Sequence, residues 1–409
     1  MRVVEAGQIR ARLRALGVDV PRVVVGGNYS TPWALLALVD QELPQYRLFA
    51  LNPQAGWPVR DGVVTMTPFV GPGVRGQSTL EYLPMRLSLV PRLLATTHEP
   101  DIVLIQVTPP LDGRVSLGTE VNILPAALRA AQRRGGLVVA QINSELPYTF
   151  GDAEIDVDEI DLALEASAPL ASPPARSLDD VHGVIGERVA ALAQDGATLQ
   201  TGIGGVPDAV LVALTSRRRM GVWSEMISDG VMSLDRAGRL EVERPIVTTF
   251  AFGSASFYKW LDRNPRVVFR RTELVNNPAR IAEQPLMFSI NTAIEVDLYA
   301  QANASYVRGR IYSGFGGQPD FVAGALHSRG GQAVLALRSW FDDGDRSTIV
   351  PHLTDPSCSF QHSAVVSEQG TAHIFGRSQR EQASALIQCA AHPRARAALE
   401  DAAWRLGLR

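Results

Sequence analysis

The sequence has almost no lysine, only two cysteines and no long apolar run. Lys259 is the only lysine among the 39 basic residues of the 409-residue chain. No glycines frame it, which excludes a phosphate-binding loop of the G-x-x-x-x-G-K-[ST] type, and nothing near it suggests a Schiff-base lysine. Cys358 and Cys389 are too few for a four-cysteine or C-x-x-C site, and no two histidines have the H-E-x-x-H spacing. The sequence therefore predicts no metal site.

Signals for a membrane or a nucleic-acid partner are also missing. No run approaches the roughly 18 apolar residues of a membrane span. The Arg-rich segment 1–17 lacks the apolar core of a signal peptide. Acidic and basic side chains nearly balance, with a net charge of −3, which gives no electrostatic basis for binding nucleic acid or an anionic membrane. We expect a cytoplasmic protein that binds neither.

The chain does contain an alternation of apolar, strand-like runs and helical stretches. Hydrophobic residues make up 46% and charged residues 20%, as in a globular chain long enough for two domains. Strands separated by helices of this length indicate βαβ units and a largely parallel sheet. The first half predicts strands at 22–27, 46–51, 62–66, 102–107 and 137–142, and helices at 32–39 and 124–134.

A change of composition at residues 165–180 predicts a domain boundary. This segment has three prolines, many small residues and no periodic apolar pattern. We expect an N-terminal α/β domain at 1–170, a linker at 171–180 and a C-terminal α/β domain at 181–409. The last is expected to hold strands near 198–201, 246–250, 267–270, 304–306, 333–337 and 364–366, and helices at 181–193, 378–389 and 395–406.

Three segments of the second domain carry residue types suited to chemistry. In 198–211, a strand passes through glycines into a helix opened by Pro207; the N–H groups of such a helix start can face an anion, although glycines that pack a helix against a sheet are commoner. In 221–230, Glu225 lies at a strand end, where a carboxylate acts as a nucleophile or a base, or simply as an exposed or capping acid. In 312–325, four glycines let the backbone approach a ligand, or form an ordinary turn.

These segments and several others resemble the acetyl-CoA hydrolase/transferase proteins, which include 4-hydroxybutyrate and acetate CoA-transferases. The matching segments follow the family's order along nearly the whole chain. Each match alone is weak, but their common order makes the resemblance specific. It rests mainly on Gln106-Val-Thr-Pro-Pro, Gly196-Ala-Thr-Leu-Gln-Thr-Gly-Ile-Gly, Ser224-Glu-Met-Ile-Ser-Asp-Gly, Val275-Asn-Asn-Pro, Gly316-Gly-Gln-Pro-Asp-Phe, Ser367-Glu-Gln-Gly and Gly376-Arg-Ser-Gln-Arg-Glu-Gln-Ala.

The resemblance implies two tandem open α/β domains of the CoA-transferase type, an active site in the cleft between them, and a homodimer. It implies that Glu225 is the covalent nucleophile and that Gly317 and Asn276 supply the donors that stabilise an oxyanion. Trp223 stands where relatives carry a smaller residue or a histidine, so we expect it to line the acyl pocket with Thr108, which follows the strand 102–107. The residues implied to border CoA are Gln200, Gly202, Gly204, Gly314, Gly316, Gln318 and Asp320.

The implied reaction is the ping-pong transfer of CoA from an acyl-CoA to a carboxylic acid, through a glutamyl anhydride and a glutamyl-CoA thioester on Glu225. CoA is then a substrate, and no cofactor is held permanently. A glutamate with its ordinary pKa of about 4.3 is expected to be ionised and ready at neutral pH. Three alternatives stay open: an acyl-CoA hydrolase on the same scaffold, an acyltransferase with an unusual acceptor in a specialised pathway, and a non-catalytic CoA-binding protein.

Overall fold

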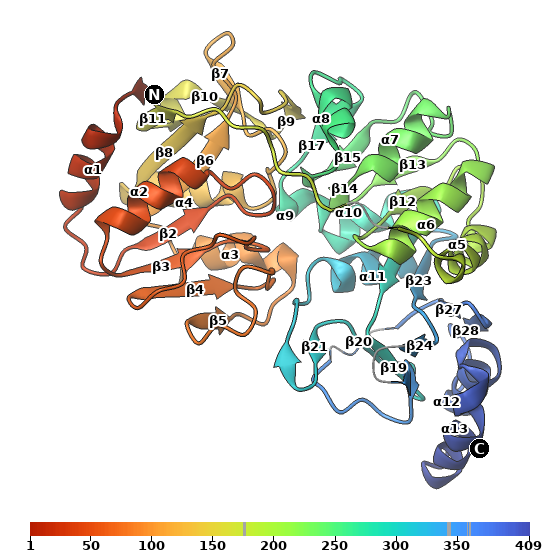
Figure 1. Ribbon diagram of the computed structural model, residues 1–409. Coiled ribbons are helices and arrows are strands. Elements are labelled where there is room, and N and C mark those ends of the chain that lie inside the picture. Colours follow the sequence, from red (N-terminus) through yellow and green to blue (C-terminus); the bar gives the residue numbers. More distant parts are fainter. Residues whose placement is uncertain (175–176, 342–344, 358, 360) are drawn as a thin grey trace. The chain divides into compact units, whose positions relative to one another are not determined.

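The computed structural model describes residues 1–174, 177–341, 345–357, 359 and 361–409 (Figure 1). The chain forms two compact units. Unit 1 comprises Met1–Pro173 and Ile246–Val275, and unit 2 comprises Pro174–Pro245 and Asn276–Arg409. The change from unit 1 to unit 2 after Pro173 lies within the segment predicted as a linker, of which residues 175 and 176 fall outside the described residues.

Unit 1 contains a segment that the sequence assigned to the C-terminal domain, Ile246–Val275. In this segment β15 (Ile246–Thr248) pairs with β17 (Val267–Phe269), and β17 pairs in turn with β9 (Phe150–Gly151), which precedes the linker. The pairing of β17 with β9 joins strands that are more than a hundred residues apart in the chain. No change of composition marks the points where the chain enters and leaves unit 1 again. The sequence therefore could not assign Ile246–Val275 to unit 1.

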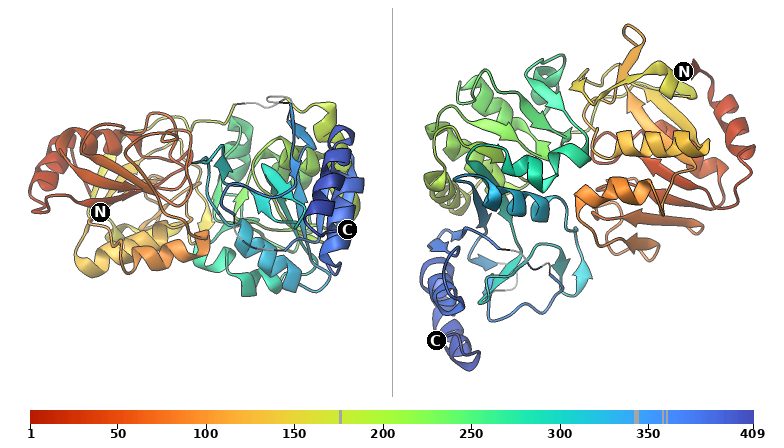
Figure 2. Two further views of the ribbon diagram at one scale, coloured as in Figure 1. Left: turned by 90° about the horizontal axis from the view of Figure 1, so that it is seen from below. Right: turned by 180° about the vertical axis from the view of Figure 1, so that it is seen from behind.

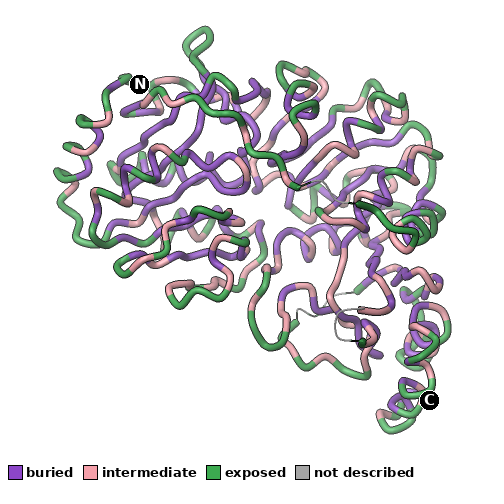
Figure 3. The backbone as a smooth tube through the Cα atoms, in the orientation of Figure 1, coloured by how far each residue is buried: buried purple, intermediate pink, exposed green. Residues whose placement is uncertain are grey.

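An eight-stranded sheet, in which every strand runs parallel to its neighbours, forms the centre of unit 1. Its strands lie in the order β1 (Arg2–Val3), β11 (Leu162–Glu165), β8 (Leu137–Ile142), β6 (Ile102–Val107), β2 (Arg22–Val25), β3 (Tyr46–Phe49), β4 (Val63–Thr67) and β5 (Leu80–Tyr82). All residues of β6 and β8 are buried, as their purple trace in Figure 3 shows. A parallel sheet covered on both faces requires such continuous apolar strands, and both were predicted with these bounds.

The helices of unit 1 follow from local signals. In α4 (Leu124–Arg134), Pro125 fits the first turn, Gly135 ends the helix with a positive φ of 71°, and two arginines lie in the last turn, where the helix dipole favours cations. The helix has the predicted bounds. The other elements of unit 1 are α1 (Ala6–Arg14), α2 (Trp33–Glu42), α3 (Val90–Leu94), β7 (Arg114–Ser116), β10 (Glu154–Asp156), β16 (Phe250–Ala251), α8 (Ala255–Leu261) and α9 (Thr272–Val275).

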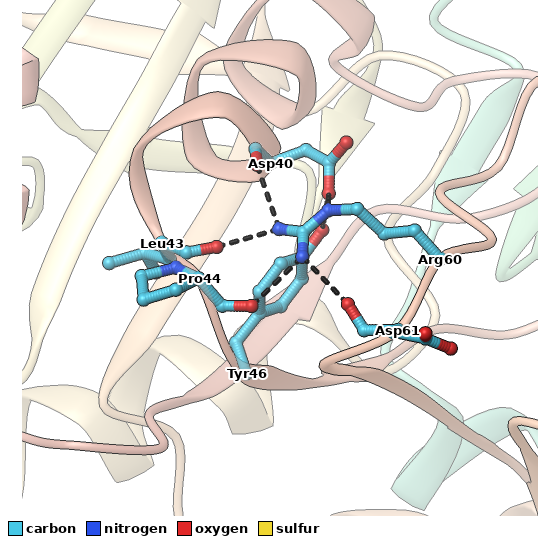
Figure 4. A network of polar contacts seen from close by, with 6 residues as sticks. All are labelled: Asp40, Leu43, Pro44, Tyr46, Arg60 and Asp61. Carbon is cyan, nitrogen blue, oxygen red and sulfur yellow. Dashed lines mark hydrogen bonds and ion pairs between the residues drawn. The ribbon is translucent and has the colours of Figure 1, made fainter.

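One arginine fastens the end of α2 to the next strand (Figure 4). The Nε of Arg60 lies 2.9 Å from Oδ1 of Asp40. The guanidinium carbon of Arg60, Cζ, lies over the Tyr46 ring, 5.7 Å from its centre. The Tyr46 hydroxyl donates to the same Asp40 oxygen at 2.8 Å. Arg60 also donates to the carbonyl oxygens of Asp40, Leu43, Pro44 and Asp61. This network satisfies carbonyl groups left open where the helix ends.

The main sheet of unit 2 is parallel except at one edge. Its strands lie in the order β28 (Gly370–His373), β27 (Ala364–Ser367), β23 (Gln332–Ala336), β18 (Met287–Thr292), β12 (Thr198–Gln200) and β13 (Gly221–Trp223), and only the β27–β28 pair is antiparallel. The chain leaves β12 for β13 on one side and later enters β18 on the other. The strand order therefore reverses between β12 and β18, and ligands of open α/β sheets bind outside the carboxyl ends of strands at such a point.

Helices flank this sheet and connect its strands. Helix α6 (Gly205–Ala213) joins β12 to β13 and packs against α5 (Asp180–Leu192), while α11 (Gln318–His327) joins β18 to β23. The connection from β12 to β13 and the connection from β18 to β23 run in opposite directions along the sheet. Since both crossovers are right-handed, α6 and α11 lie on opposite faces of the sheet. Both begin at the carboxyl edge of the sheet. Other helices are α7 (Asp229–Arg236), α10 (Pro278–Ala282), α12 (Gln379–Ala385) and α13 (Pro393–Arg405).

The C-terminal helices of unit 2 lie beside its sheet (Figure 2). Their apolar side chains form one buried cluster with residues of the strands β23 and β27. A capping box in which Ser378 and Glu381 bond each other's backbone starts α12, and the imidazole of His392 caps α13. Short strand pairs lie between the main elements: β14 (Met226–Ile227), β19 (Glu295–Asp297), β20 (Ala302–Asn303), β21 (Tyr306–Val307), β22 (Arg310–Ile311), β24 (Trp340–Phe341), β25 (Arg346–Ser347) and β26 (Ile349–Val350).

Candidate active site

Glu225 lies at the carboxyl edge of the unit 2 sheet, between β13 and β14. The preceding residue anchors it: the Ser224 hydroxyl accepts from the Thr201 N–H and donates to the Thr201 carbonyl, both at 3.2 Å. Thr201 follows β12, which runs parallel to β13. These bonds fix the segment 221–230 beside the glycine turn 201–205, so the first two segments singled out in the sequence lie side by side.

Two donors hold the same carboxylate. The side-chain amide of Asn276 donates to Oε2 of Glu225 at 2.7 Å, and the backbone N–H of Gly317 also donates to this carboxylate. Asn276 precedes Asn277, the N-cap residue of α10, and Gly317 is the N-cap residue of α11. Asn276 and Gly317, which lie 51 and 92 positions along the chain from Glu225, thus converge on its carboxylate.

Gly317 is required for space rather than for its backbone conformation. Its φ of −90° suits any residue. A Cβ at this position, however, would lie 1.8 Å from Oε2 of Glu225 and 2.3 Å from Nδ2 of Asn276. Gly316 differs, because its φ of +56° lies in the left-handed region that favours glycine. The pair therefore turns the chain and then brings a backbone N–H against the carboxylate.

The surroundings raise the pKa of Glu225 to about 7. Burial is the main cause, because it disfavours the charged form, and the nearby Asp320 carboxylate adds to it; the bonds from Asn276 and Gly317 act in the opposite direction. Glu225 itself has intermediate exposure. The sequence predicted a glutamate with an ordinary pKa, fully ionised at neutral pH. That expectation is wrong, because sequence alone does not reveal how far the carboxylate is enclosed.

Polar groups beside Glu225 still have unused hydrogen-bonding capacity. Asn276 is fully buried, and its Oδ1 has no partner among the described residues; the same holds for Nε2 of Gln318, the first residue of α11. Asp320, 1% exposed, lies in the first turn of α11, where the helix dipole favours a negative charge. Unsatisfied buried groups are costly, so their presence here favours a ligand-binding role.

Other residues predicted to border CoA have internal partners. Gln200 is 4% exposed, and its Oε1 accepts from the Ser289 hydroxyl at 2.6 Å and from the Asn291 amide at 3.4 Å. These bonds link β12 to the buried strand β18. The same polar residues explain why β18, Met287–Thr292, was not predicted as a strand: Ser289 and Asn291 interrupt its apolar pattern.

The remaining predicted residues lie in both units. Gly202 and Gly204 form the turn before α6, where Gly204 has a φ of 134°, and Gly314 is buried ahead of α11. Trp223 ends β13 with intermediate exposure. Thr108 belongs to unit 1, where its hydroxyl accepts from the Ser116 N–H at 3.0 Å and so helps to join β6 to β7. That Trp223 and Thr108 line the acyl pocket stays a prediction.

In the part of the chain that the structure describes, no group of three or more His, Cys, Asp or Glu side chains could hold a metal ion. None of the helices in this part is both long and apolar enough to cross a membrane. Cys389 is a partly buried free thiol in the helical turn Leu386–Ala390, and Cys358 lies outside the described residues.

Several known proteins are similar to this chain in sequence. A succinyl-CoA:acetate/propanoyl-CoA:succinate CoA transferase of Fasciola hepatica is 36% identical over 94% of this chain and 85% of its own length. The chain belongs to the acetyl-CoA hydrolase/transferase family. Residues 253–403 match the acetyl-CoA hydrolase/transferase C-terminal domain. The predicted family is confirmed, and with it the prediction of an enzyme.

Other members cover both known activities of the family. A 4-hydroxybutyrate coenzyme A transferase of Clostridium kluyveri is 40% identical over 78% of this chain and 76% of its own length. An acetyl-CoA hydrolase of Kluyveromyces lactis is 34% identical over 48% of this chain and 38% of its own length. The crystal structure of RipA from Yersinia pestis matches with a TM-score of 0.91 and 27% identity, covering 100% of this chain and 98% of RipA. The predicted α/β fold of the CoA-transferase type is confirmed.

Proposed function

We propose that the enzyme is an acyl-CoA:carboxylate CoA-transferase with Glu225 as its covalent nucleophile. Its substrates are an acyl-CoA and a carboxylic acid, and it holds no cofactor permanently. The observation that carries this proposal is the enclosed Glu225 carboxylate, one oxygen of which accepts from Asn276 while Gly317 donates to the same group. The names of the transferases in the family support the same reaction class.

The first half-reaction moves CoA onto the enzyme. The ionised Glu225 attacks the thioester carbonyl carbon of the acyl-CoA; the C–S bond breaks, and CoA leaves as a thiolate from a glutamyl anhydride. The thiolate then attacks the carboxyl carbon of Glu225 itself. The anhydride C–O bond breaks, the acid leaves as a carboxylate, and a glutamyl-CoA thioester remains. Each step exchanges one anion for another, so no proton transfer is needed once Glu225 is ionised.

The second half-reaction runs the same steps in reverse with another acid. The carboxylate of this acid attacks the glutamyl-CoA carbonyl and expels the CoA thiolate. The acid and Glu225 are then joined in a new anhydride. The thiolate attacks the acyl carbon of this anhydride, and the new acyl-CoA leaves with Glu225 regenerated as a carboxylate. This symmetry explains why one glutamate serves as nucleophile and as leaving group.

Asn276 and Gly317 have a specific role in this sequence. Attack of the thiolate on the Glu225 carboxyl carbon places negative charge on a Glu225 oxygen. The two donors already lie at that group, so they stabilise the charge without reorganisation. A single donor of this type is typically worth ~10²–10³ in rate. Asn276 and Gly317 are therefore proposed to stabilise the oxyanion formed on Glu225.

Substrate-binding roles are part of the proposal. Gln200, Gly202, Gly204, Gly314, Gly316, Gln318 and Asp320 are proposed to border CoA, and Trp223 and Thr108 to line the acyl pocket. If Trp223 limits the pocket, Trp223→Ala shifts the preferred acyl-CoA chain length, whereas identical chain-length profiles contradict its role. The interdomain position of the site, the homodimer and the cytoplasmic location stay predictions.

A hydrolase is the second candidate, because acetyl-CoA hydrolases occur in the same family. Water would then attack the anhydride or the glutamyl-CoA. The two reactions differ in one measurable product, since hydrolysis releases free CoA thiol and transfer does not.

The test measures transfer and thiol release together. The protein is incubated with acetyl-, propionyl-, butyryl- and succinyl-CoA, each with isotope-labelled acetate or succinate, and labelled acyl-CoA is quantified beside free thiol. Labelled acyl-CoA without net thiol supports a transferase; thiol without label supports a hydrolase and contradicts the proposal. Glu225→Gln should abolish both reactions, while Glu243→Gln, at an exposed position of the same unit, should leave them unchanged.

A further inference from the structure

A cavity of about 640 Å³ opens in unit 2 at the edge of the main sheet opposite to Glu225. Residues just before β27 and just after β28 line it, and β28 runs antiparallel to β27, with His373 beside Ala364. The cavity therefore lies at the amino edge of the sheet, whereas Glu225 follows the carboxyl end of β13. Four strand steps of ~4.8 Å place β27 roughly 19 Å from β13. No residue predicted for catalysis or for CoA binding lines the cavity.

The buried part of the cavity wall carries no charge. Ala300 and Ile374 contribute apolar surface there, and both are almost completely buried. His362 lines the same part and is 1% exposed. Burial lowers the pKa of His362 to about 4, so its imidazole is neutral at neutral pH. A ligand group that reaches this depth must be uncharged, because a buried charge without a partner is strongly disfavoured.

One buried oxygen of the cavity wall has no hydrogen-bond partner among the described residues. It is Oε1 of Gln301, whose Nε2 donates to the Tyr299 carbonyl at 3.3 Å. The turn that carries Gln301 is held by Asp297, whose Oδ1 accepts from the backbone N–H groups of Tyr299 and Gln301 at 3.0 and 2.9 Å. The acceptor thus lies in a fixed turn. A buried acceptor without a partner is costly, so it favours a ligand that offers an O–H or N–H group.

The rim of the cavity carries its only charge. Arg377, exposed just before α12, is the one charged residue among the described residues that line the cavity. It forms no ion pair within the described part of the chain. The acid four positions further on, Glu381, is engaged in the capping box, where it accepts from the N–H and the hydroxyl of Ser378 at 2.8 and 2.7 Å. A guanidinium in this position favours a carboxylate on the ligand.

The rim also offers aromatic surface. Phe375 lines the cavity and is 64% exposed, and Tyr299 lines it with intermediate exposure. Ligand sites commonly combine such walls with a few polar groups that give orientation, in cavities of about 300–1,000 Å³. Aromatic rings pack well on one another in offset or edge-to-face geometry. The wall therefore fits a ring that carries a neutral donor on one side and an anionic group on the other.

We propose that this cavity binds an aromatic carboxylic acid that carries a hydroxyl group. The carboxylate pairs with Arg377 at the rim, the ring packs on Phe375 and Ile374, and the hydroxyl donates to Oε1 of Gln301. Binding here does not depend on the proposed reaction, because the cavity shares no residue with the Glu225 site. The enzyme would thus hold an organic acid at a second place, remote from the chemistry.

The test measures the binding of 4-hydroxyphenylacetate by calorimetry. Wild type should bind one equivalent per chain. Arg377→Met should weaken binding about 10- to 100-fold, the usual effect of losing a hydrogen bond to a charged group, and Gln301→Met about 2- to 10-fold, the effect of losing a neutral one. Arg380→Met is the control, because Arg380 is an exposed residue of α12 that does not line the cavity, and it should bind like wild type. Thermal unfolding checks that each variant is folded.

Two related probes separate the contributions of the ligand groups. Phenylacetate lacks the hydroxyl, so it should bind wild type more weakly, and Gln301→Met should weaken it no further. 4-Hydroxyphenylacetamide lacks the charge, so it should also bind more weakly, and Arg377→Met should weaken it no further. Equal affinity of wild type for phenylacetate and 4-hydroxyphenylacetate, or an affinity for the latter that Arg377→Met leaves unchanged, overturns the proposal.

The proposed reaction also takes carboxylic acids, so Glu225→Gln distinguishes the two sites. This variant should retain the binding of 4-hydroxyphenylacetate and its dependence on Arg377. Binding that is lost in Glu225→Gln, or no saturable binding by wild type, overturns the cavity as a site and leaves the proposed function as it stands. Arg377-dependent binding by a protein that shows no CoA transfer supports the cavity and contradicts only the proposed function.

Discussion

The side-chain amide of Asn276 lies 2.7 Å from Oε2 of Glu225, and the other polar atom of that amide, Oδ1, has no partner among the described residues. This bond joins two elements of unit 2 that enclose a carboxylate whose pKa is about 7. A carboxylate that is enclosed, held by donors and still able to ionise near neutral pH has the properties of a nucleophile.

The pH dependence of the first chemical step should report the ionisation of Glu225. Only the ionised form attacks the thioester, so the rate of adduct formation should rise with pH and level off above a midpoint near 7. Asp320→Asn removes the neighbouring charge that raises this pKa, and the midpoint should move to lower pH. Rapid-quench measurement of adduct formation between pH 5 and 9 gives both curves. A wild-type midpoint near 4.5, or an upward shift in the variant, would contradict this origin of the pKa.

The stability of the protein should depend on the same group. A carboxyl group whose pKa is raised in the folded state binds its proton more tightly there, so its contribution to stability is present below about pH 4.5 and is lost as the pH rises towards 7. Replacing it with a neutral amide removes this loss. Relative to wild type, Glu225→Gln should gain about 3 kcal/mol in unfolding free energy between pH 5 and pH 8, from about 1.4 kcal/mol for each pKa unit.

Denaturant unfolding at several pH values measures this difference. Glu243→Gln is the control, since Glu243 is exposed and its substitution should leave the pH dependence as in wild type. A Glu225→Gln curve parallel to that of wild type across the range would show that burial does not penalise the charged form.

Gly317→Ala should inactivate the enzyme without unfolding it. The added Cβ would lie 1.8 Å from Oε2 of Glu225, so either the carboxylate or the loop must move and the Gly317 donor is lost. We expect kcat to fall by at least about 10²-fold. The backbone conformation suits alanine, so the melting temperature should change little. Gly183→Ala is the matched control: its Cβ meets nothing within 4 Å, and its activity should equal that of wild type.

Asn276 can be tested by removing its amide and by replacing it with a charge. Asn276→Ala should lower kcat about 10²- to 10³-fold through the loss of one donor. Asn276→Asp places a second carboxylate about where the amide donated, so the two acids repel each other and the pH midpoint of adduct formation should move above that of wild type. An unchanged midpoint in Asn276→Asp would mean that residue 276 does not contact the reacting carboxylate during turnover.

Local patterns predicted much of the fold. The strands β6 and β8 and the helix α4 have the bounds expected from apolar runs and helix punctuation. By contrast, β18 was missed because Ser289 and Asn291 look polar in sequence, although Gln200 satisfies both inside the sheet. The place of Ile246–Val275 in unit 1 depends on pairing with β9, a contact between distant residues that no local pattern encodes.

The site was predicted unevenly for the same reason. Glu225, Asn276 and Gly317 were singled out because short motifs of a known family carry them. Their convergence and the raised pKa of Glu225 depend on tertiary packing, which the sequence does not display.

The central claim is that CoA becomes bound covalently to Glu225. The most direct test is intact-mass spectrometry of the protein mixed with short acyl-CoAs, followed by peptide mapping, beside Glu225→Ala. We predict that wild type gains the mass of CoA with loss of water, that the modification maps to the peptide containing Glu225, and that Glu225→Ala shows no gain. An adduct of equal yield in Glu225→Ala, or turnover of acyl-CoA by this variant at the wild-type rate, would contradict it.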